Sequence, residues 1–436
     1  MTGQAALTPH GATPGAAPAP RIAAPTDWRG EAMRRRIARR YAAERRFRLM
    51  GLAAVLLSAG FLAFLLVTMV GNGARGFTRT QIALPIDFQR SAILIDPALL
   101  TGGNAEQALA GANLPAVIDK AAETAFGENG ARMISPAAQT AVRKAIIADP
   151  AILTGTATIT VPASEGIDVA AKGQGSAANE AAVARLQQAG ALSTGLNLRF
   201  LTASDGTDPT LVGIWGALKG SLLTMAVTLA LSFPVGVFAA LYLEEYAPRN
   251  RWTDLIEVSI NNLAAVPSII FGLLGLAIFL NLMHLPRSAP LVGGMTLALM
   301  TMPVIVIAGR NAIKAVPPSI RDAALGIGAS PVQVVFHHVL PLALPGILTG
   351  TIIGMARALG ETAPLLMIGM RAFVASPPHG VMDPASVLPV QIFLWSDEVG
   401  HGFIEKTSAA IIVLLAFLLT MNSIAIYLRN KFEKKW

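Results

Sequence analysis

The amino-acid sequence predicts an all-α polytopic membrane protein with six transmembrane helices. Hydrophobic residues make up 53% of the 436 residues, charged residues make up only 14%, and the mean hydropathy is +0.56. Soluble domains carry about 25% charged residues, whereas a membrane span needs about 20 consecutive apolar residues. The expected spans are residues 49–70, 220–243, 258–283, 288–309, 342–370 and 407–428.

Lysine and arginine residues predict the orientation of these spans, because short cytoplasmic segments retain positive charge. With a cytoplasmic N-terminus, the cytoplasmic segments hold 19 of the 34 basic residues. We therefore expect both termini in the cytoplasm. The cytoplasmic segments would be residues 1–48, 244–257, 309–341 and 429–436.

Residues 1–48 form a basic tail before the first span. Ten basic residues lie between Arg21 and Arg48, and residues 1–30 are rich in alanine, proline and glycine. Such a composition cannot bury enough apolar surface to fold alone, so we expect a partly disordered tail. A second basic tail, 429–436, follows the last span, so the charge indicates contact with anionic lipid of the bilayer and not with nucleic acid. The first span is too long for a signal peptide, which predicts an uncleaved anchor.

The segment 71–210 has the composition of a soluble protein, with 10 basic and 12 acidic residues. It lies between the first and second spans, so we expect an extracytoplasmic (periplasmic) domain inserted there, since long segments cross the membrane largely regardless of charge. Its patterning indicates an α-rich domain with one strand, GTATITVP at 155–162. The run GNGARG at 71–76 formally matches a dinucleotide-binding motif. Because it follows a span instead of a strand, we interpret it as a flexible exit from the membrane.

The sequence contains no recognisable catalytic machinery. Cysteine is absent, which excludes disulfides, thiolate nucleophiles and cysteine-ligated metals. No phosphate-binding P-loop motif and no pairing of a nucleophile with a base occurs. His337 and His338 are adjacent and point apart on a helix, so we expect no metal site. These observations predict that this chain has no catalytic site and binds no cofactor, and that another chain supplies any nucleotide hydrolysis.

The cytoplasmic segment 316–341 carries its own helix boundaries. Pro317 and Pro318 can begin a helix, Gly328 can end it, and Ser330 before a proline can cap the next one. The expected result is a helix, a glycine turn and a second helix at the membrane surface. Such a pair suits docking into a groove of a soluble partner, although a structured loop between two spans would have the same boundaries.

The same segment resembles the permeases of type I ABC importers, which carry a Glu-Ala-Ala motif, a following glycine and a later Leu-Pro pair. The corresponding residues here are Asp322, Ala323, Ala324, Gly328, Leu340 and Pro341. Asp322 replaces the usual glutamate, and His338 stands where the family prefers isoleucine. The resemblance implies that residues 211–428 are a permease core with five transmembrane helices. It also implies that the loop couples this core to a separate ATPase, which uses ATP and Mg.

A second stretch, RALGETAPLL at 357–366, narrows the resemblance. Its run from Gly360 to Pro364 is similar to the signature of the phosphate-specific transport permease family PstA, whereas the partner family PstC continues differently after the threonine. Arg310 and Arg321 match arginines at similar places in PstA. The resemblance implies import of inorganic phosphate across the bacterial cytoplasmic (inner) membrane. The implied partners are a PstC-like second permease, two copies of an ABC ATPase and an extracytoplasmic phosphate-binding protein.

Arg357 and Glu361 are two charges inside an apolar stretch, four residues apart and on one face of the expected helix. Charges at that depth cost at least ~2.5 kcal/mol each on insertion scales, so they should face a cavity, a partner or one another. One interpretation is a local ion pair that holds the helix bundle together. The other places Arg357, Glu361, Thr362 and Arg310 on the translocation path. There Arg357 attracts an oxyanion, and Glu361 accepts a hydrogen bond from a protonated phosphate but repels a fully ionised anion.

The same helix carries small residues at every fourth position, among them Gly346, Gly350 and Gly354. Small residues at this spacing let a neighbouring backbone approach closely, in a permease dimer as in any polytopic bundle. Pro364 removes the backbone donor for the carbonyl of Gly360, which predicts a hinge beside the charged pair.

Two other functions fit parts of the sequence. The permease could import another oxyanion, such as molybdate or sulfate, although the Gly-Glu-Thr-Ala-Pro run argues against it. A membrane sensor could use residues 71–210 as its receptor. That class needs a cytoplasmic signalling domain, and we expect the eight residues after the last span to leave no room for one.

Overall fold

The computed structural model describes residues 30–91, 109, 111–370 and 373–432. The disorder expected for residues 1–30 falls almost entirely outside this part of the chain. The molecule divides into two compact units, residues 1–65 and 66–436. Most of the tertiary packing belongs to the second unit.

The first unit contains most of the long helix α1 (Glu31–Gly76), which continues into the second unit. The expected span 49–70 lies within α1, but the helix also runs through the basic tail, because arginine, alanine and glutamate are good helix formers. An ion pair between Arg48 and Glu44, 3.6 Å long, lies along this extension. Residues 71–76 are helical too, so the expected flexible exit from the membrane is wrong.

Residues 78–203, here called the inserted domain, are organised around a three-stranded antiparallel sheet. Its strands lie in the order β2-β1-β3 and are β1 (Thr78–Asp87), β2 (Thr156–Pro162) and β3 (Leu192–Leu196). Alternate side chains of β1 are fully buried, at Ile82, Leu84 and Ile86. This period of two is that of a strand with one face on a hydrophobic core.

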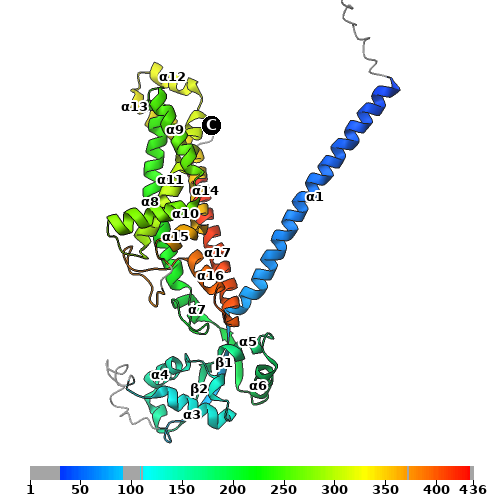
Figure 1. The fold of residues 1–436 in the computed structure, drawn as a ribbon, viewed down its shortest axis with the longest axis vertical. Coiled ribbons are helices and arrows are strands. Elements are labelled where there is room, and N and C mark those ends of the chain that lie inside the picture. The colour runs from blue at the N-terminus through cyan, green and yellow to red at the C-terminus, as the bar shows by residue number, and fades with distance from the viewer. Residues whose placement is uncertain (1–29, 92–108, 110, 371–372, 433–436) are drawn as a thin grey trace, which may run out of the picture. The chain divides into compact units, whose positions relative to one another are not determined.

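Helices make up most of the rest of the inserted domain (Figure 1). They are α3 (Leu114–Phe126), η2 (Ala131–Met133), α4 (Ala138–Ala148), η3 (Pro150–Thr154), α5 (Glu165–Ala171), α6 (Ala177–Gln188) and α7 (Leu198–Thr202). The domain is helix-rich as expected, and the predicted strand is β2. The strands β1 and β3 were not predicted. The five residues of β3 include a glycine and carry little strand propensity of their own, and it is their pairing with β1 that makes them a strand.

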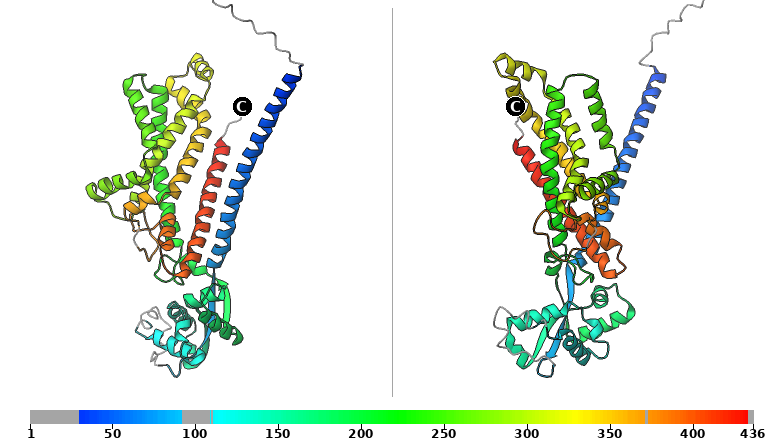
Figure 2. Two further views of the ribbon diagram at one scale, coloured as in Figure 1. Left: turned by 45° about the vertical axis from the view of Figure 1, so that its right-hand side comes forward. Right: turned by 60° about the vertical axis from the view of Figure 1, so that its left-hand side comes forward.

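The second half of the chain forms a helical core. Its elements are α8 (Trp215–Leu241), η4 (Tyr242–Tyr246), α9 (Arg251–Ala264), α10 (Ser268–Gly275), η5 (Leu276–Leu282), α11 (Pro290–Lys314), α12 (Pro318–Gly326), α13 (Pro331–Gln333), η6 (Val334–Val339), α14 (Leu340–Gly360), α15 (Ala363–Met367), α16 (Leu388–Ser396) and α17 (His401–Phe432). Helix α11 packs against both α8 and α14 (Figure 2). Apolar side chains such as Val237, Ile305 and Ile347 are buried in this contact.

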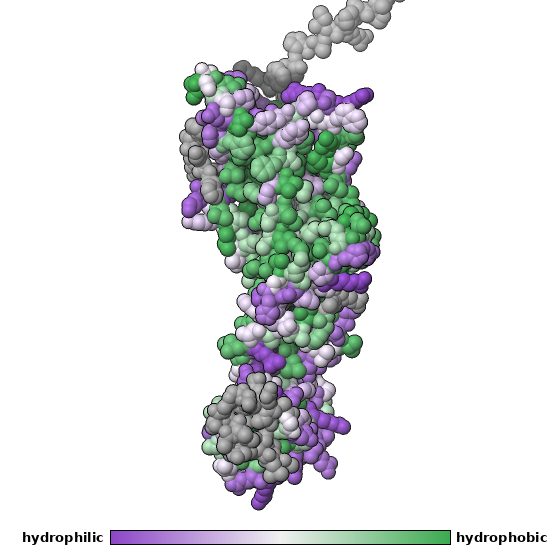
Figure 3. Space-filling model, turned by 90° about the vertical axis from the view of Figure 1, so that its left-hand side faces the viewer, coloured by the Kyte–Doolittle hydropathy of each residue, from purple (hydrophilic) through white to green (hydrophobic). Residues whose placement is uncertain are grey.

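Five helices of the described chain are long and apolar enough to cross a membrane, and one bent pair would make a sixth. In that pair, α9 meets α10 and its continuation η5 at an angle of 100°. The span expected at 258–283 therefore corresponds to a broken pair of helices. The bend lies at Pro267, which lacks a backbone donor and disfavours helical geometry at Val266. Apolar side chains cover the face of the core seen in Figure 3 as a continuous band.

The predicted stripe of small residues lies in the contact between α14 and α11. A methyl group added to Gly346 would lie 2.6 Å from Cβ of Ala312, and one added to Gly350 would collide with Cβ of Ala308. The glycines therefore let the two helix backbones approach closely. Gly360 is different, because nothing lies within 4 Å of the position of its absent methyl group, so it takes no part in the contact.

We expect the substitution Gly350→Ala to lower the melting temperature of the detergent-solubilised chain, measured by circular dichroism. The added methyl group must push α14 away from α11, and overpacking of this kind costs about 1–3 kcal/mol. Gly360→Ala makes the same chemical change in open space and should leave the melting temperature within error of wild type. Equal melting temperatures for all three proteins would contradict the close helix contact.

Candidate functional site

The run from Gly360 to Pro364 forms a break between two helices instead of the continuous helix expected at 342–370. Helix α14 ends at Gly360, and Glu361 has extended backbone angles, φ −77° and ψ 121°. The next helix, α15, begins at Ala363 with Pro364 in its first turn. Proline is tolerated in the first turn because the backbone donor it lacks would have no partner there. The hinge predicted from Pro364 is thus a complete interruption of the helix.

Arg357 and Glu361 remain in contact across the end of α14. Nε of Arg357 lies 3.4 Å from Oε1 of Glu361, and the two side chains are 48% and 19% exposed. Arg357 also lies in the last turn of the helix, where the negative end of the helix dipole favours a cation. The pair is therefore formed, yet the chain itself leaves about half of the arginine side chain uncovered.

Thr362 and Pro364 occupy the break itself. Thr362 is partly buried, and its carbonyl accepts a hydrogen bond from the backbone of Leu366 at 3.0 Å. Pro364 is buried against α10, where a methyl group added to Gly272 would lie 2.6 Å from its Cα. The break thus turns α15 onto α10, while the charged pair stays at the end of α14.

Arg310 lies apart from the other path candidates. Its Nη2 lies 2.8 Å from Oε2 of Glu257, and its Nε lies 3.4 Å from Oε2 of Glu244. Lys314 lies 3.6 Å from the same oxygen of Glu244. These contacts hold the C-terminal part of α11 to the end of α8 and to α9. The antiparallel contact of α11 with α14 places Arg310 beside the first half of α14, about two turns or more before Arg357.

The predicted helix pair is present in the loop between α11 and α14. Helix α12 is followed by Gly328 with φ +91°, a conformation that favours glycine. Ser330 then forms a capping box with Gln333: its hydroxyl accepts from the backbone of Gln333, and the Gln333 side chain accepts from the backbone of Ser330. The second helix runs through α13 and η6 into α14, which begins at Leu340 with Pro341 in its first turn.

Arg321 ties this loop to the membrane helices. Its Nη2 lies 2.7 Å from Oε1 of Glu245, in η4, which continues α8. It also donates hydrogen bonds to the carbonyls of Ile313 and Val316, at 3.0 and 2.7 Å, and so satisfies carbonyls near the end of α11. One guanidinium thereby holds α12, α8 and α11 together, a geometry that the planar fork of arginine suits better than lysine.

Several polar and apolar side chains of the loop are exposed. Asp322 and Ala323 are exposed, whereas Ala324 is buried against the core. The large apolar side chains exposed on the same loop are Leu325 (50%), Ile327 (83%), Val332 (55%) and Phe336 (42%). Large exposed apolar side chains of this kind are typical of an interaction site.

Sequence reasoning missed the carboxylates that partner these arginines. Glu244 and Glu245 end the apolar stretch of α8, and Glu257 lies on α9. The signal was present, since adjacent acidic residues at the end of a span need partners on neighbouring helices. Only the packing of α8 and α9 on α11 decides which arginine each carboxylate meets.

Two family models match this chain. Residues 232–435 match the family described as binding-protein-dependent transport system inner membrane component. Residues 34–181 match a family described as a domain of unknown function.

Three curated proteins illustrate the resemblance. The probable ABC transporter permease protein YqgI of Bacillus subtilis is 30% identical over 256 residues, which are 55% of this chain and 85% of that protein. The phosphate transport system permease protein PstA 1 of Mycobacterium tuberculosis is 30% identical over 50% of this chain and 70% of that protein. The phosphate transport system permease protein PstC of Haemophilus influenzae is 29% identical over 47% of this chain and 70% of that protein.

Among solved structures, the inward-facing MetNI methionine ABC transporter is similar over 51% of this chain and 98% of that chain, with 18% identity and a TM-score of 0.41. This structural likeness is distant, so the assignment rests on the sequence relatives. Together with the apolar helices, they show a multi-pass inner-membrane permease subunit of an ABC importer. The chain belongs to the binding-protein-dependent transport system inner membrane components, and among them to the PstA-type permeases.

Proposed function

We propose that this permease imports inorganic phosphate, and that Arg357 and Glu361 lie on its translocation path. The observation that carries the proposal is the half-exposed Arg357 at the end of a membrane-spanning helix. An arginine in such a position needs an aqueous cavity or another protein chain beside it, since its exposure to lipid is costly. The relatives named as phosphate transport permeases support phosphate as the anion.

The chemistry of the pair suits a protonated oxyanion. Arginine offers several N–H donors in a planar fork that matches the oxygens of phosphate. Glu361 lies beside it as an acceptor and a negative charge. A phosphate that keeps at least one proton near neutral pH can donate a hydrogen bond to Glu361, whereas sulfate has no proton to donate and is repelled. The ion pair of the free protein would open as the anion replaces the carboxylate on the guanidinium.

A second permease subunit supplies the missing cover for Arg357 in this proposal. The likeness to PstC as well as to PstA supports a paired arrangement of two permeases. Alternating access would then open the path between the two chains first to one side of the membrane and then to the other. An extracytoplasmic phosphate-binding protein would deliver the anion.

We infer that the energy comes from two copies of a separate ABC ATPase, which bind ATP and Mg and dock on the cytoplasmic loop. The exposed Asp322, Leu325 and Ile327 provide a polar and apolar docking surface. Because Arg321 fastens α12 to α8 and α11, a displacement of the loop would reach both helices as a rigid-body motion. This arrangement requires the loop, and with it both termini of the chain, to lie in the cytoplasm.

The anion site is tested by phosphate uptake into vesicles that contain the assembled transporter and internal ATP. We expect Arg357→Ala to lower phosphate uptake about tenfold or more, because a charge-assisted hydrogen bond contributes about 1.5–3 kcal/mol. Glu361→Gln should retain phosphate uptake but lose discrimination against sulfate. Arg429→Ala is the control, since the side-chain hydrogen bonds of Arg429 go to the neighbouring Asn430 near the end of α17.

Two outcomes would overturn parts of this proposal. Unchanged rate and sulfate discrimination in Glu361→Gln would remove Glu361 from the path. Uptake of sulfate or molybdate in place of phosphate by the wild-type transporter would change the substrate and leave the permease class intact.

The docking surface is tested by co-purification with the ATPase from the same membrane extract. We expect Ile327→Asp to reduce the amount of bound ATPase severalfold, because it puts a charge where an apolar side chain is 83% exposed. Val399→Asp makes the same change at a side chain that is 97% exposed in the loop before α17, and it should leave ATPase binding unchanged. Equal recovery of the ATPase with both variants would place the docking surface elsewhere.

A further inference from the structure

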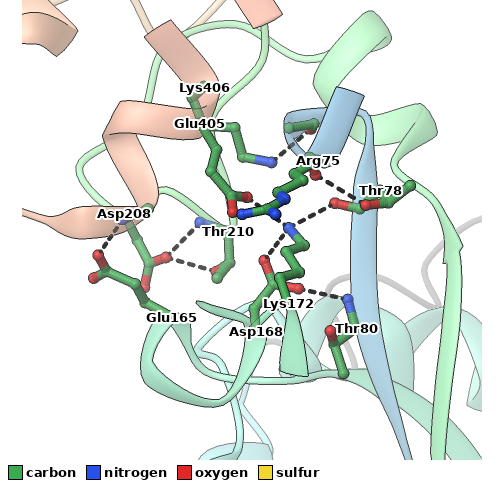
Figure 4. Close-up of polar contacts among 12 residues, drawn as sticks. Arg75, Thr78, Thr80, Glu165, Asp168, Lys172, Asp208, Thr210, Glu405 and Lys406 are labelled. Carbon is green, nitrogen blue, oxygen red and sulfur yellow. Dashed lines mark hydrogen bonds and ion pairs between the residues drawn. The ribbon is translucent and has the colours of Figure 1, made fainter. Parts of the chain in front are cut away.

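Away from the candidate site, four charged side chains meet where the inserted domain adjoins α17 (Figure 4). We call this cluster the junction; its members are Asp168, Lys172, Glu405 and Lys406. Nζ of Lys172 lies 2.8 Å from Oδ2 of Asp168 and 2.8 Å from Oε2 of Glu405. It also donates to the carbonyl of Thr78 at 3.2 Å. A single ammonium group therefore bonds the end of α5, strand β1 and helix α17.

The junction is buried, and it contains two ammonium and two carboxylate groups. The side chains of Lys172 and Glu405 are only 8% and 4% exposed, and Asp168 is 14% exposed. Lys406 is 3% exposed, and it donates to the carbonyl of Gly76 at 2.9 Å. Two positive and two negative charges thus share one buried region. Removal of one member of the Lys172–Glu405 pair would leave the other charge buried and uncompensated, which is strongly destabilising.

Further contacts hold the same helix, α5, to both sides of the junction. Oδ1 of Asp168 accepts a hydrogen bond from the backbone of Thr80 at 2.7 Å, which ties α5 to β1. Oε1 of Glu165 accepts from the backbone of Gly402 at 2.7 Å, in the first turn of α17. A carboxylate at that end of a 32-residue helix satisfies a free backbone donor and complements the helix dipole.

Aromatic packing closes another side of this region. The ring of Phe77 meets that of Phe200 edge to face at 5.5 Å, and Trp395 lies 6.2 Å from Phe200 and 6.4 Å from Phe403. The indole of Trp395 donates to Asp205 at 3.0 Å. These rings come from four segments, namely the end of α1, α7, α16 and α17. They add apolar contact to the ionic contact of the junction.

Close backbone approach completes the attachment. A methyl group added to Gly76 would lie 2.5 Å from the carbonyl oxygen of Glu405, and one added to Gly73 would lie 3.0 Å from that of Ser408. The last turn of α1 therefore lies directly on the first turns of α17. Since β1 begins two residues after Gly76, no flexible linker separates α1 from the inserted domain.

From this geometry we propose that the junction locks the inserted domain to α17, so that domain and helix move as one rigid body. The Lys172 bridge between Asp168 and Glu405 is the element that makes the attachment rigid. The inference deepens the proposed function and rests on it for the motion itself. As α17 shifts during transport, the inserted domain moves with it, and a displacement of the domain is transmitted directly to α17.

The absence of cysteine allows a direct test, because introduced cysteines carry spin labels without background. One label replaces the exposed Gln188 at the end of α6, and the other replaces the exposed Ile404 of α17. Pulsed electron paramagnetic resonance on the full chain in lipid nanodiscs should give one narrow distribution of the distance between the two spin labels. With the ATPase and permease partners bound, the same distance should be found with and without a non-hydrolysable ATP analogue.

Removing the bridge should release the domain. We expect Glu405→Gln to at least double the width of the distance distribution, while the pair between Asp168 and Lys172 within the domain remains. Lys172→Met should have a similar effect. The distribution of the double variant should be no broader than that of the broader single variant, since both changes break the same Lys172–Glu405 pair. Asp87→Asn is the matched control, because it also removes a carboxylate from an ion pair. The pair of Asp87 with Arg90 is largely exposed and lies within the domain, so its loss should leave the distance distribution unchanged.

The outcomes separate this inference from the proposed function. A narrow, unchanged distribution in Glu405→Gln would overturn the lock, and so would a broad distribution in the wild-type chain alone. A trypsin digest of each variant checks that the inserted domain stays folded; if Lys172→Met unfolds it, Glu405→Gln decides the question. A transporter with narrow distances that does not import phosphate would refute the proposed substrate and leave the lock standing.

Discussion

The close contact of α14 with α11 is the constraint on which the rest of the helical core depends. Glycines at 346 and 350 allow the two backbones to approach without intervening side chains. One end of α14 continues from the loop that follows α11, and the other end carries Arg357 beside the break at Gly360. The close helix contact therefore holds α14 against α11 between these two ends.

Most buried charges of the described chain lie near the ends of helices, where they join separate elements. Arg310 and Arg321 bind carboxylates at the end of α8 or on α9 and hold the loop side of the core. Lys172 and Glu405 do the same where the inserted domain meets α17. Each of these pairs is largely covered by the chain. Arg357 differs, because its partner is local and its side chain is half exposed, and this contrast separates a candidate transport residue from structural ones.

The break at Gly360 to Pro364 both ends α14 and changes the direction of the chain. It ends α14 with a cation in the last turn, and it redirects the chain so that Pro364 packs on Gly272 of α10. A continuous helix would have carried Glu361 along the same face as Arg357. The extended backbone at Glu361 instead places this carboxylate just beyond the C-terminal end of α14, where the free backbone groups are carbonyls.

The sequence by itself determined the features that depend on local chemistry. Apolar runs located the spans, because a helix needs about 20 apolar residues to cross the hydrocarbon core of a bilayer. Pro317, Gly328 and Ser330 marked the helix pair of the loop through their own backbone preferences. The charges Arg357 and Glu361 stood out because charged side chains are costly within an apolar, membrane-spanning stretch. Only the tertiary structure decided the partners of Arg310 and Arg321, the pairing of β3, and the bridge between Lys172 and Glu405. That bridge joins residues 233 positions apart. Such contacts depend on which surfaces meet after folding, and no local preference of the chain encodes them.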